Sequence, residues 1–268
     1  MEALETLPMN QDVLPPENIY GHTKRVRWIL DQVRPGATLI ELGCGTGYMI
    51  SRPLTRLGYE MYGVDLDRRS VEYGQQVLRD EGLDPERLQP IDLRDLDVQA
   101  DAVIASEILE HVPDEHLGAL FDAIRSRLRP GGQVLVTVPN GRGWFELESF
   151  LWFKTGLGEL LRKLGILRLT VRVKRKLFGA ETDYAHPSTL ADSPHVRFFT
   201  LASIRRLLRE QGLEVTTATG SVLFAGPFSN LAFTGIGPVM RLNALLGRWF
   251  PRIAAGFYVA CRPASSAD

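Results

Sequence analysis

Residues 39–49 (LIELGCGTGYM) place three glycines, Gly43, Gly45 and Gly47, at alternate positions, with Glu41 two residues before the first of them. Glycine adopts positive φ and has no Cβ, so such a stretch lets a ligand lie against the backbone. A helix that begins after it offers free N–H groups to that ligand. The spacing is one residue shorter than the G-x-G-x-x-G of dinucleotide sites, and a carboxylate is a poor neighbour for pyrophosphate. We therefore predict a cationic, nucleoside-like ligand without phosphate.

S-adenosylmethionine has these properties, because it carries an amino group, a sulfonium, a ribose and an adenine. The stretch ELGCGTG (41–47) resembles the first motif of class I S-adenosylmethionine-dependent methyltransferases. Further segments resemble later parts of this family in the same order, including the subgroup with the ubiquinone-biosynthesis-type methyltransferases: VDLD (64–67), IDLRD (91–95), SEILEHV (106–112), LRPGGQVLVTVPN (128–140) and HVRFFTLASIRRLLREQGLEV (195–215). The resemblance covers about residues 20–140 and 195–220, and a last strand at 254–262.

The resemblance implies a cofactor site for S-adenosylmethionine. Asp65 would chelate the ribose hydroxyls, Asp92 would accept from the adenine amine, and Leu93 would lie at the adenine ring. Tyr20 would cover the methionine end, and Glu41 would face the positive end of the cofactor. The predicted cofactor-binding residues are Tyr20, Glu41, Gly43, Cys44, Gly45, Thr46, Gly47, Asp65, Leu66, Asp92, Leu93, Ser106, Glu107 and His111.

Three histidines are candidates for a catalytic role: His111, His195 and His186. A hydroxyl acceptor needs a general base, which histidine can supply, whereas methyl transfer to an amine needs only positioning. The alternative for His111 is a structural pair with Glu107, four residues earlier. The other two histidines lie in a polar segment, where a histidine is often only a loop residue. No spacing of ligands indicates a metal site, and we predict none.

The elements that would position these residues alternate between strands and helices. Such alternation predicts an α/β fold: a doubly wound, mostly parallel, seven-stranded sheet with an antiparallel last strand. We expect a single domain over residues 1–268, with a mobile arm at 1–18. The strands are expected at 37–42, 61–65, 87–92 (at an end or edge because of Pro90), 101–106, 133–138, 213–219 and 254–263, and the helices near 47–57, 69–82, 114–129 and 200–211.

Two mainly helical insertions, 141–195 and 221–253, interrupt this alternation. Both are rich in Trp, Phe and Leu, and residues 141–268 carry 17 Lys and Arg against 9 Asp and Glu. One interpretation is a peripheral membrane contact through 144–178 and 226–252, because apolar helices beside basic clusters bind membrane surfaces. The other is a lid over the substrate with a solvated basic rim. Both favour a hydrophobic or amphipathic acceptor, such as a lipid-linked saccharide.

These observations predict a methyltransferase, most simply one that methylates oxygen. A non-catalytic S-adenosylmethionine-binding scaffold is a second hypothesis, since binding residues alone do not require turnover. A nicotinamide-dependent oxidoreductase is a third, but the glycine spacing and Glu41 speak against it. Nucleic acid is not an expected partner, because the net charge is −1 and SEIL replaces the [DN]PP[YF] typical of DNA amino-methylating enzymes. Two distant cysteines and an acidic, polar start predict a cytoplasmic protein.

Overall fold

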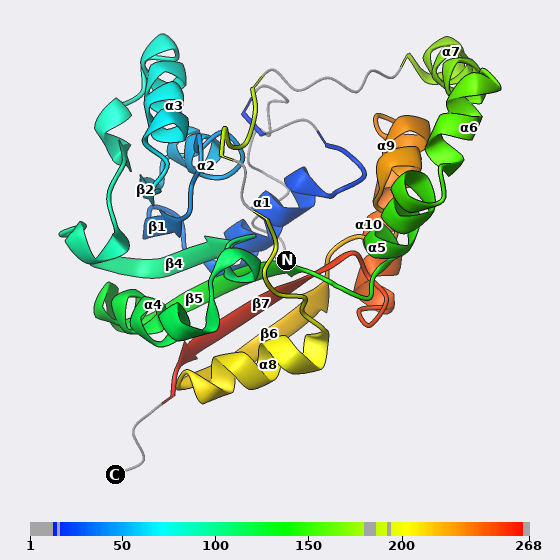
Figure 1. Ribbon diagram of the computed structural model, residues 1–268. Coiled ribbons are helices and arrows are strands. Elements are labelled where there is room, and N and C mark those ends of the chain that lie inside the picture. The colour runs from blue at the N-terminus through cyan, green and yellow to red at the C-terminus, as the bar shows by residue number, and fades with distance from the viewer. Residues whose placement is uncertain (1–12, 15–16, 180–185, 192–193, 265–268) are drawn as a thin grey trace.

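The computed structural model describes residues 13–14, 17–179, 186–191 and 194–264. Its centre is one seven-stranded sheet with the order β3-β2-β1-β4-β5-β7-β6 (Figure 1). The strands are β1 Thr38–Leu42, β2 Glu60–Val64, β3 Leu88–Gln89, β4 Ala100–Ser106, β5 Leu128–Pro139, β6 Leu213–Gly220 and β7 Gly256–Pro263. Parallel pairing joins β3, β2, β1, β4 and β5, whereas β7 runs antiparallel to both β5 and β6. The predicted fold class is therefore confirmed, and β3 lies at an edge as Pro90 indicated.

Helices cover both faces of the sheet. On one face, α1 (His22–Gln32) and α2 (Ser51–Arg56) pack against β1 and β4 through buried side chains such as Ile29 and Leu54. On the other face, α4 (Asp114–Ser126) and α8 (Leu201–Glu210) pack through Phe121 and Leu208. α3 (Arg68–Asp80) buries Val71 in a small cluster with Leu88 of β3 and Cys44. This two-sided burial explains why the central strand β4 is apolar and buried over residues 102–105.

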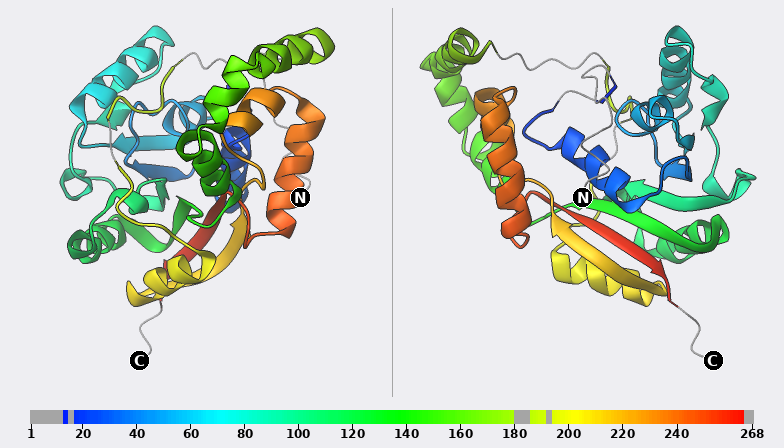
Figure 2. Two further views of the ribbon diagram at one scale, coloured as in Figure 1. Left: turned by 45° about the vertical axis from the view of Figure 1, so that its right-hand side comes forward. Right: turned by 180° about the vertical axis from the view of Figure 1, so that it is seen from behind.

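The two predicted insertions form a helical body beside the sheet (Figure 2). The first contains α5 (Trp144–Ser149), the π-helical turn η4 (Phe150–Lys154), α6 (Leu157–Lys163) and α7 (Ile166–Phe178). The second contains α9 (Pro227–Phe233) and α10 (Gly237–Trp249). They contact each other: Glu148 of α5 accepts hydrogen bonds from the backbone N–H of Ser229 at 2.8 Å and from its hydroxyl at 2.5 Å.

The structure differs from the sequence-based expectations most clearly at two places. Leu14 and Asn18, both placed in the expected mobile arm, are buried, so part of that arm packs onto the domain. Strand β5 begins at Leu128, so the Pro130-Gly131-Gly132 stretch that was expected to precede the strand lies inside it. The pairing shifts from Ala100↔Leu128 to Ala102↔Gln133, an irregularity that accommodates these extra residues.

Candidate active site

The glycine loop connects β1 to α2 and uses the conformational freedom of all three glycines. Gly43, Gly45 and Gly47 have φ values of 67°, 54° and 67°, in the region that disfavours other residues. The N–H of Gly43 donates to the carbonyl of Val64 at 2.8 Å, so the loop is fixed against the end of β2. The loop lies at the point where the sheet order reverses between β1 and β4, which is where open α/β sheets bind ligands.

Two carboxylates flank this loop. Glu41 is buried, and its Oε2 accepts from the N–H and the hydroxyl of Ser51 at 3.0 and 2.5 Å. Burial raises the pKa of Glu41 to about 8, although the Ser51 hydrogen bonds oppose this shift. Asp65 follows β2 and accepts from the N–H of Gly45 at 2.7 Å and of Asp67 at 2.8 Å. Both carboxylates therefore lie beside the glycines from different strands.

A cavity of about 850 Å³ opens at this edge of the sheet. Apart from histidines, its ionisable lining residues are four acids and one arginine: Glu41, Asp65, Asp67, Glu107 and Arg25. The Arg25 guanidinium is paired with the Glu107 carboxylate at 3.3 Å, so it offers little free positive charge. Such a lining fits a cationic ligand and disfavours a pyrophosphate. The residues present therefore fit S-adenosylmethionine.

The end of β4 carries a connected polar network. The Ser106 hydroxyl lies 2.9 Å from the Thr137 hydroxyl and accepts from Arg25 at 3.2 Å. Thr137 donates to the Glu107 carboxylate at 2.8 Å. Glu107 is the only described residue other than glycine with a positive φ, 54°. Strained backbone of this kind concentrates at functional sites, and here it holds the Glu107 side chain at the cavity wall.

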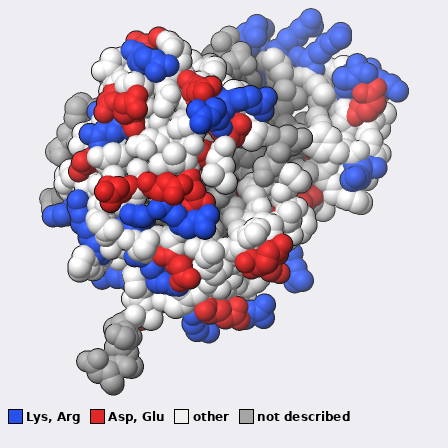
Figure 3. Space-filling model, turned by 60° about the vertical axis from the view of Figure 1, so that its left-hand side comes forward, with Lys and Arg blue, Asp and Glu red and all other residues white. Residues whose placement is uncertain are grey.

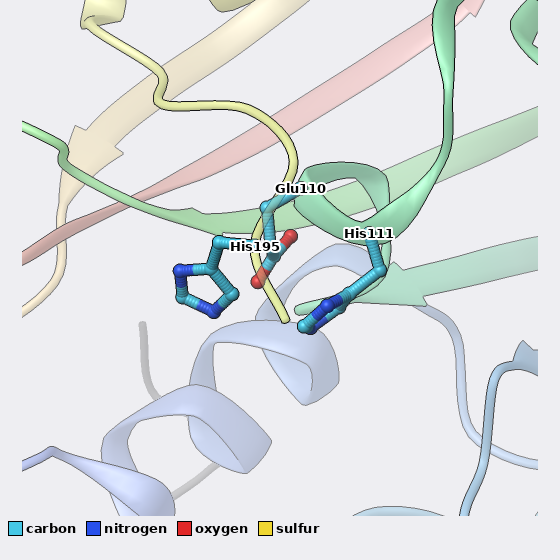
Figure 4. A group of neighbouring side chains, drawn as sticks. All are labelled: Glu110, His111 and His195. Atoms are coloured by element: carbon cyan, nitrogen blue, oxygen red, sulfur yellow. The ribbon is translucent and has the colours of Figure 1, made fainter. Parts of the chain in front are cut away.

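Glu110, His111 and His195 lie close together, and Figure 4 shows their side chains near one another. The two histidines line this cavity. The His111 and His195 rings are 4.8 Å apart at their centroids. His111 Nδ1 lies 3.1 Å from the carbonyl oxygen of Pro194. A carbonyl can only accept, so Nδ1 carries the proton, and Nε2 of the neutral ring is an acceptor.

Glu110 is buried behind the two histidines. Burial, together with the neighbouring Glu107 carboxylate, raises the pKa of Glu110 well above its usual range and favours the neutral acid. One ligand atom from each of Glu110, His111 and His195 lies within 4.8 Å of the others. Among the described residues, this trio is close enough to share an ion; the sequence indicated no metal site.

Most of the predicted site residues line one cavity. Those that do are Tyr20, Glu41, Gly43, Cys44, Gly45, Asp65, Ser106, Glu107, His111 and His195. The other predicted residues, Thr46, Gly47, Leu66, Asp92, Leu93 and His186, do not line it. Asp92 instead forms an ion pair with Arg94 at 2.8 Å, and Leu66 is 77% exposed.

His186 lies on the α3 side of the loop. Its Nδ1 is 2.8 Å from the Tyr73 hydroxyl, and its ring packs 5.1 Å from that of Tyr48. This placement argues against the predicted catalytic role of His186.

Several lining residues were not predicted from the sequence. They are His22, Arg25, Met49, Ile108, Phe145, Ser188, Thr189 and Tyr258, among others. No sequence motif marks these residues as parts of one site, because they lie far apart in the sequence, in segments such as a helix, an insertion, a polar segment and the last strand. Burial lowers the pKa of His22 to about 3, so its imidazole is neutral. His22 is the first residue of α1 and lies two residues after Tyr20, which was predicted.

A glycine loop after β1, an acid after β2 and an antiparallel β7 between β5 and β6 define a class I methyltransferase architecture. The chain matches the family described as "Methyltransferase domain" over residues 22–218. It therefore belongs to this methyltransferase family. Family membership confirms the resemblance to methyltransferases that the sequence motifs indicated.

Curated relatives align with less than half of the chain. Identity is 33% over 115 residues to a probable fatty acid methyltransferase of Mycobacterium tuberculosis, covering 41% of this chain and 27% of that protein. It is 30% over 124 residues to sphingolipid C9-methyltransferase 1 of Gibberella zeae, covering 45% and 24%. It is 30% over 110 residues to a ubiquinone biosynthesis O-methyltransferase of Nitrobacter winogradskyi, covering 41% of each. The chain spans less than half the length of these relatives.

Solved structures share the fold at low sequence identity. The glycopeptide N-methyltransferase MtfA superposes with a TM-score of 0.54 at 15% identity, covering 96% of this chain and 98% of that chain. Magnesium protoporphyrin IX methyltransferase from Synechocystis PCC 6803, solved with bound S-adenosylhomocysteine, superposes with a TM-score of 0.50 at 18% identity, covering 90% and 80%. These likenesses support the fold.

Proposed function

We propose that the chain transfers the methyl group of S-adenosylmethionine to an oxygen of a hydrophobic or amphipathic acceptor. The observation that carries this proposal is one continuous cavity with two kinds of wall. The glycine loop, Glu41 and Asp65 form the cofactor side, and Tyr20, Phe145 and His195 form the acceptor side.

Bound S-adenosylmethionine supplies an electrophilic methyl group, which is the reactive chemistry. The residues of the chain contribute position and proton transfer. The Tyr20 and Phe145 rings lie 6.4 Å apart and offer apolar contact to the acceptor. His111 Nε2, with its other nitrogen bonded to Pro194, is placed to accept the proton of an acceptor hydroxyl. A hydroxyl acceptor needs a base to accept its proton, which His111 would supply, whereas an amine acceptor needs no such base.

The insertions supply the acceptor-binding lid in this proposal. Phe145 of α5 and Ala225, just before α9, both line the cavity. The Trp144 ring packs edge-on against Phe224 at 5.0 Å, so the two insertions meet next to the acceptor wall. A lid of this composition supports an apolar portion in the acceptor rather than a fully polar molecule.

We also propose that the protein is cytoplasmic and that the same insertions contact a membrane surface peripherally. Helix α7 exposes an apolar stripe at helical spacing, formed by Ile166, Leu169, Val173 and Leu177, and carries basic residues on its other faces. Figure 3 shows Lys and Arg side chains gathered at the top of the molecule, while both signs alternate over the lower body. Among the described residues, no helix has both the length and the apolarity needed to cross a bilayer.

Methyl-labelled S-adenosylmethionine and a panel of acceptors test the activity. The panel contains hydroxyl compounds with and without a long apolar chain, together with amine analogues of the same shape. We expect label in the chain-bearing hydroxyl compounds, with little in the short ones. Label only in the amines contradicts oxygen as the acceptor atom. Cofactor binding without label in any acceptor favours the non-catalytic scaffold.

A further inference from the structure

Residues 186–191, here called the strap, lie across the glycine loop. The N–H of Thr46 donates to the carbonyl of Ser188 at 2.9 Å, and the Thr46 hydroxyl donates to the carbonyl of Pro187 at 2.7 Å. The approach is close, because a Cβ placed on Gly45 would lie 2.3 Å from the Ser188 carbonyl oxygen. Gly45 is therefore required both by its positive φ and by contact with the strap.

Helix α3 forms a second contact with the strap. The Ser70 hydroxyl accepts from the N–H of Leu190 at 2.8 Å and lies 3.3 Å from the Thr189 hydroxyl. The Tyr73 hydroxyl lies 2.8 Å from His186 Nδ1. The strap is thus held by polar contacts at both ends of its length.

Farther along the chain, residues 196–197 are fixed on the opposite side of the cavity. Their N–H groups both donate to the carbonyl of Glu110, at 2.9 and 3.2 Å. The strap therefore starts on the α3 side and leads toward the β4 side. Ser188, Thr189 and Ala191 line the cavity together with Gly45 and Asp65, so the strap forms the outer wall of its cofactor end.

The outer surface of the strap faces solvent. Residues 187–190 are exposed, so little apolar area is buried when the strap lies on the loop. Each of its hydrogen bonds contributes modestly, because water replaces it on opening. Segments with few apolar contacts and exposed hydrogen bonds open far more readily than the core.

We propose that the strap encloses the cofactor end of the cavity and must open for the cofactor to enter and for its product to leave. This inference rests on the proposed use of the cavity for S-adenosylmethionine. Ser188 and Thr189 then belong to the cofactor site, although they lie outside the family's glycine, acid and fourth-strand motifs. Thr46, Ser70 and Tyr73 are positioning residues that hold the strap closed.

A reversible covalent lock tests the proposal. Ser70→Cys with Thr189→Cys places two sulfurs where the hydroxyl oxygens are 3.3 Å apart, within reach of disulfide formation after small side-chain rotations. The release rate of S-adenosylhomocysteine is measured before oxidation, after it and after reduction. We expect oxidation of the complex to slow release by about 100-fold or more and reduction to restore it. The parent chain and each single variant receive the same treatment, because Cys44 and Cys261 are free thiols.

A milder variant tests the closed contacts without a crosslink. Tyr73→Phe removes one hydrogen bond to His186, and the loss of one such bond predicts about a fivefold faster release. Tyr62→Phe is the matched control, since its hydroxyl bonds to Glu60, away from the strap.

Three outcomes overturn the proposal: release from the locked complex at the parent rate, expulsion of the ligand on locking, or no effect of Tyr73→Phe. Expulsion would mean that the strap and the cofactor compete for one place. If the parent chain itself binds no S-adenosylhomocysteine, the assignment of the cavity to this cofactor fails as well.

Discussion

Asp65 joins the end of β2 to the glycine loop, and each of its carboxylate oxygens accepts one backbone N–H. Each oxygen keeps a further lone pair toward the cavity, which suits two vicinal hydroxyls. We expect Asp65→Ala to weaken S-adenosylhomocysteine binding by about 100-fold, since two hydrogen bonds to a charged group are lost. Calorimetric titration gives the dissociation constants.

Asp97→Ala is the control for this change, because Asp97 is exposed and does not line the cavity. An unchanged dissociation constant in Asp65→Ala removes Asp65 from the site.

Glu41 couples cofactor binding to the release of a proton. Its pKa of about 8 leaves the carboxyl mostly protonated at pH 7 in the free protein. A nearby cation favours the carboxylate form and lowers this pKa, so binding of the cationic cofactor should release up to one proton. Titration at pH 7 in two buffers of different ionisation enthalpy measures that number. We expect release by the parent chain and none by Glu41→Gln; equal release by both contradicts the linkage.

His111 has two interpretations that kinetics can separate. As a general base it acts on the acceptor, so His111→Gln should lower kcat by about 100-fold or more while cofactor affinity stays unchanged. As a lining residue it should change cofactor affinity instead. His116→Gln is the control, because His116 is exposed on α4. The catalytic interpretation fails if kcat is unaffected.

Helix α7 shows why an insertion is difficult to interpret from sequence. The basic cluster predicted there included Lys174, but this side chain is buried, and its Nζ donates to the carbonyl of Thr234 in the α9 region at 3.2 Å. Burial also lowers the pKa of Lys174. Lys174 therefore connects the two insertions and does not contribute to the exposed basic surface.

The membrane proposal is therefore tested with the exposed cations alone. Reversal of Arg172, Arg175 and Lys176 to Glu should abolish sedimentation with anionic vesicles, since each basic residue near such a surface contributes about 1 kcal/mol. Lys174→Met is the comparison variant and should retain binding if folded. Failure of the parent chain to sediment with the vesicles ends the membrane proposal.

The elements of the sheet could be predicted from sequence because each carries a strong local signal. The strand at 101–106 contains an uninterrupted apolar run at 102–105, and the three glycines mark the turn after β1. The strap could not be predicted, because its polar, turn-rich sequence has no periodicity and its partners, such as Ser70, are about 120 residues away. The sequence also did not reveal that Phe145 lines the cavity, because only the tertiary packing of α5 places it there.

At the scale of the whole molecule, the structure separates two tasks. The glycine loop and Asp65 lie at the edge of the five parallel strands and form the proposed cofactor site. The helical body from the two insertions supplies the acceptor side in our proposal, and it lies beside the sheet rather than within it (Figure 2). Sequence motifs therefore identify the cofactor well, whereas the acceptor depends on segments that resemble no family motif.

The central claim is that this cavity binds S-adenosylmethionine. Calorimetric titration of the full chain with S-adenosylhomocysteine, and separately with NAD, tests it most directly. We predict saturable binding of S-adenosylhomocysteine at one site per chain and no measurable binding of NAD. Binding of NAD without binding of S-adenosylhomocysteine would contradict the account.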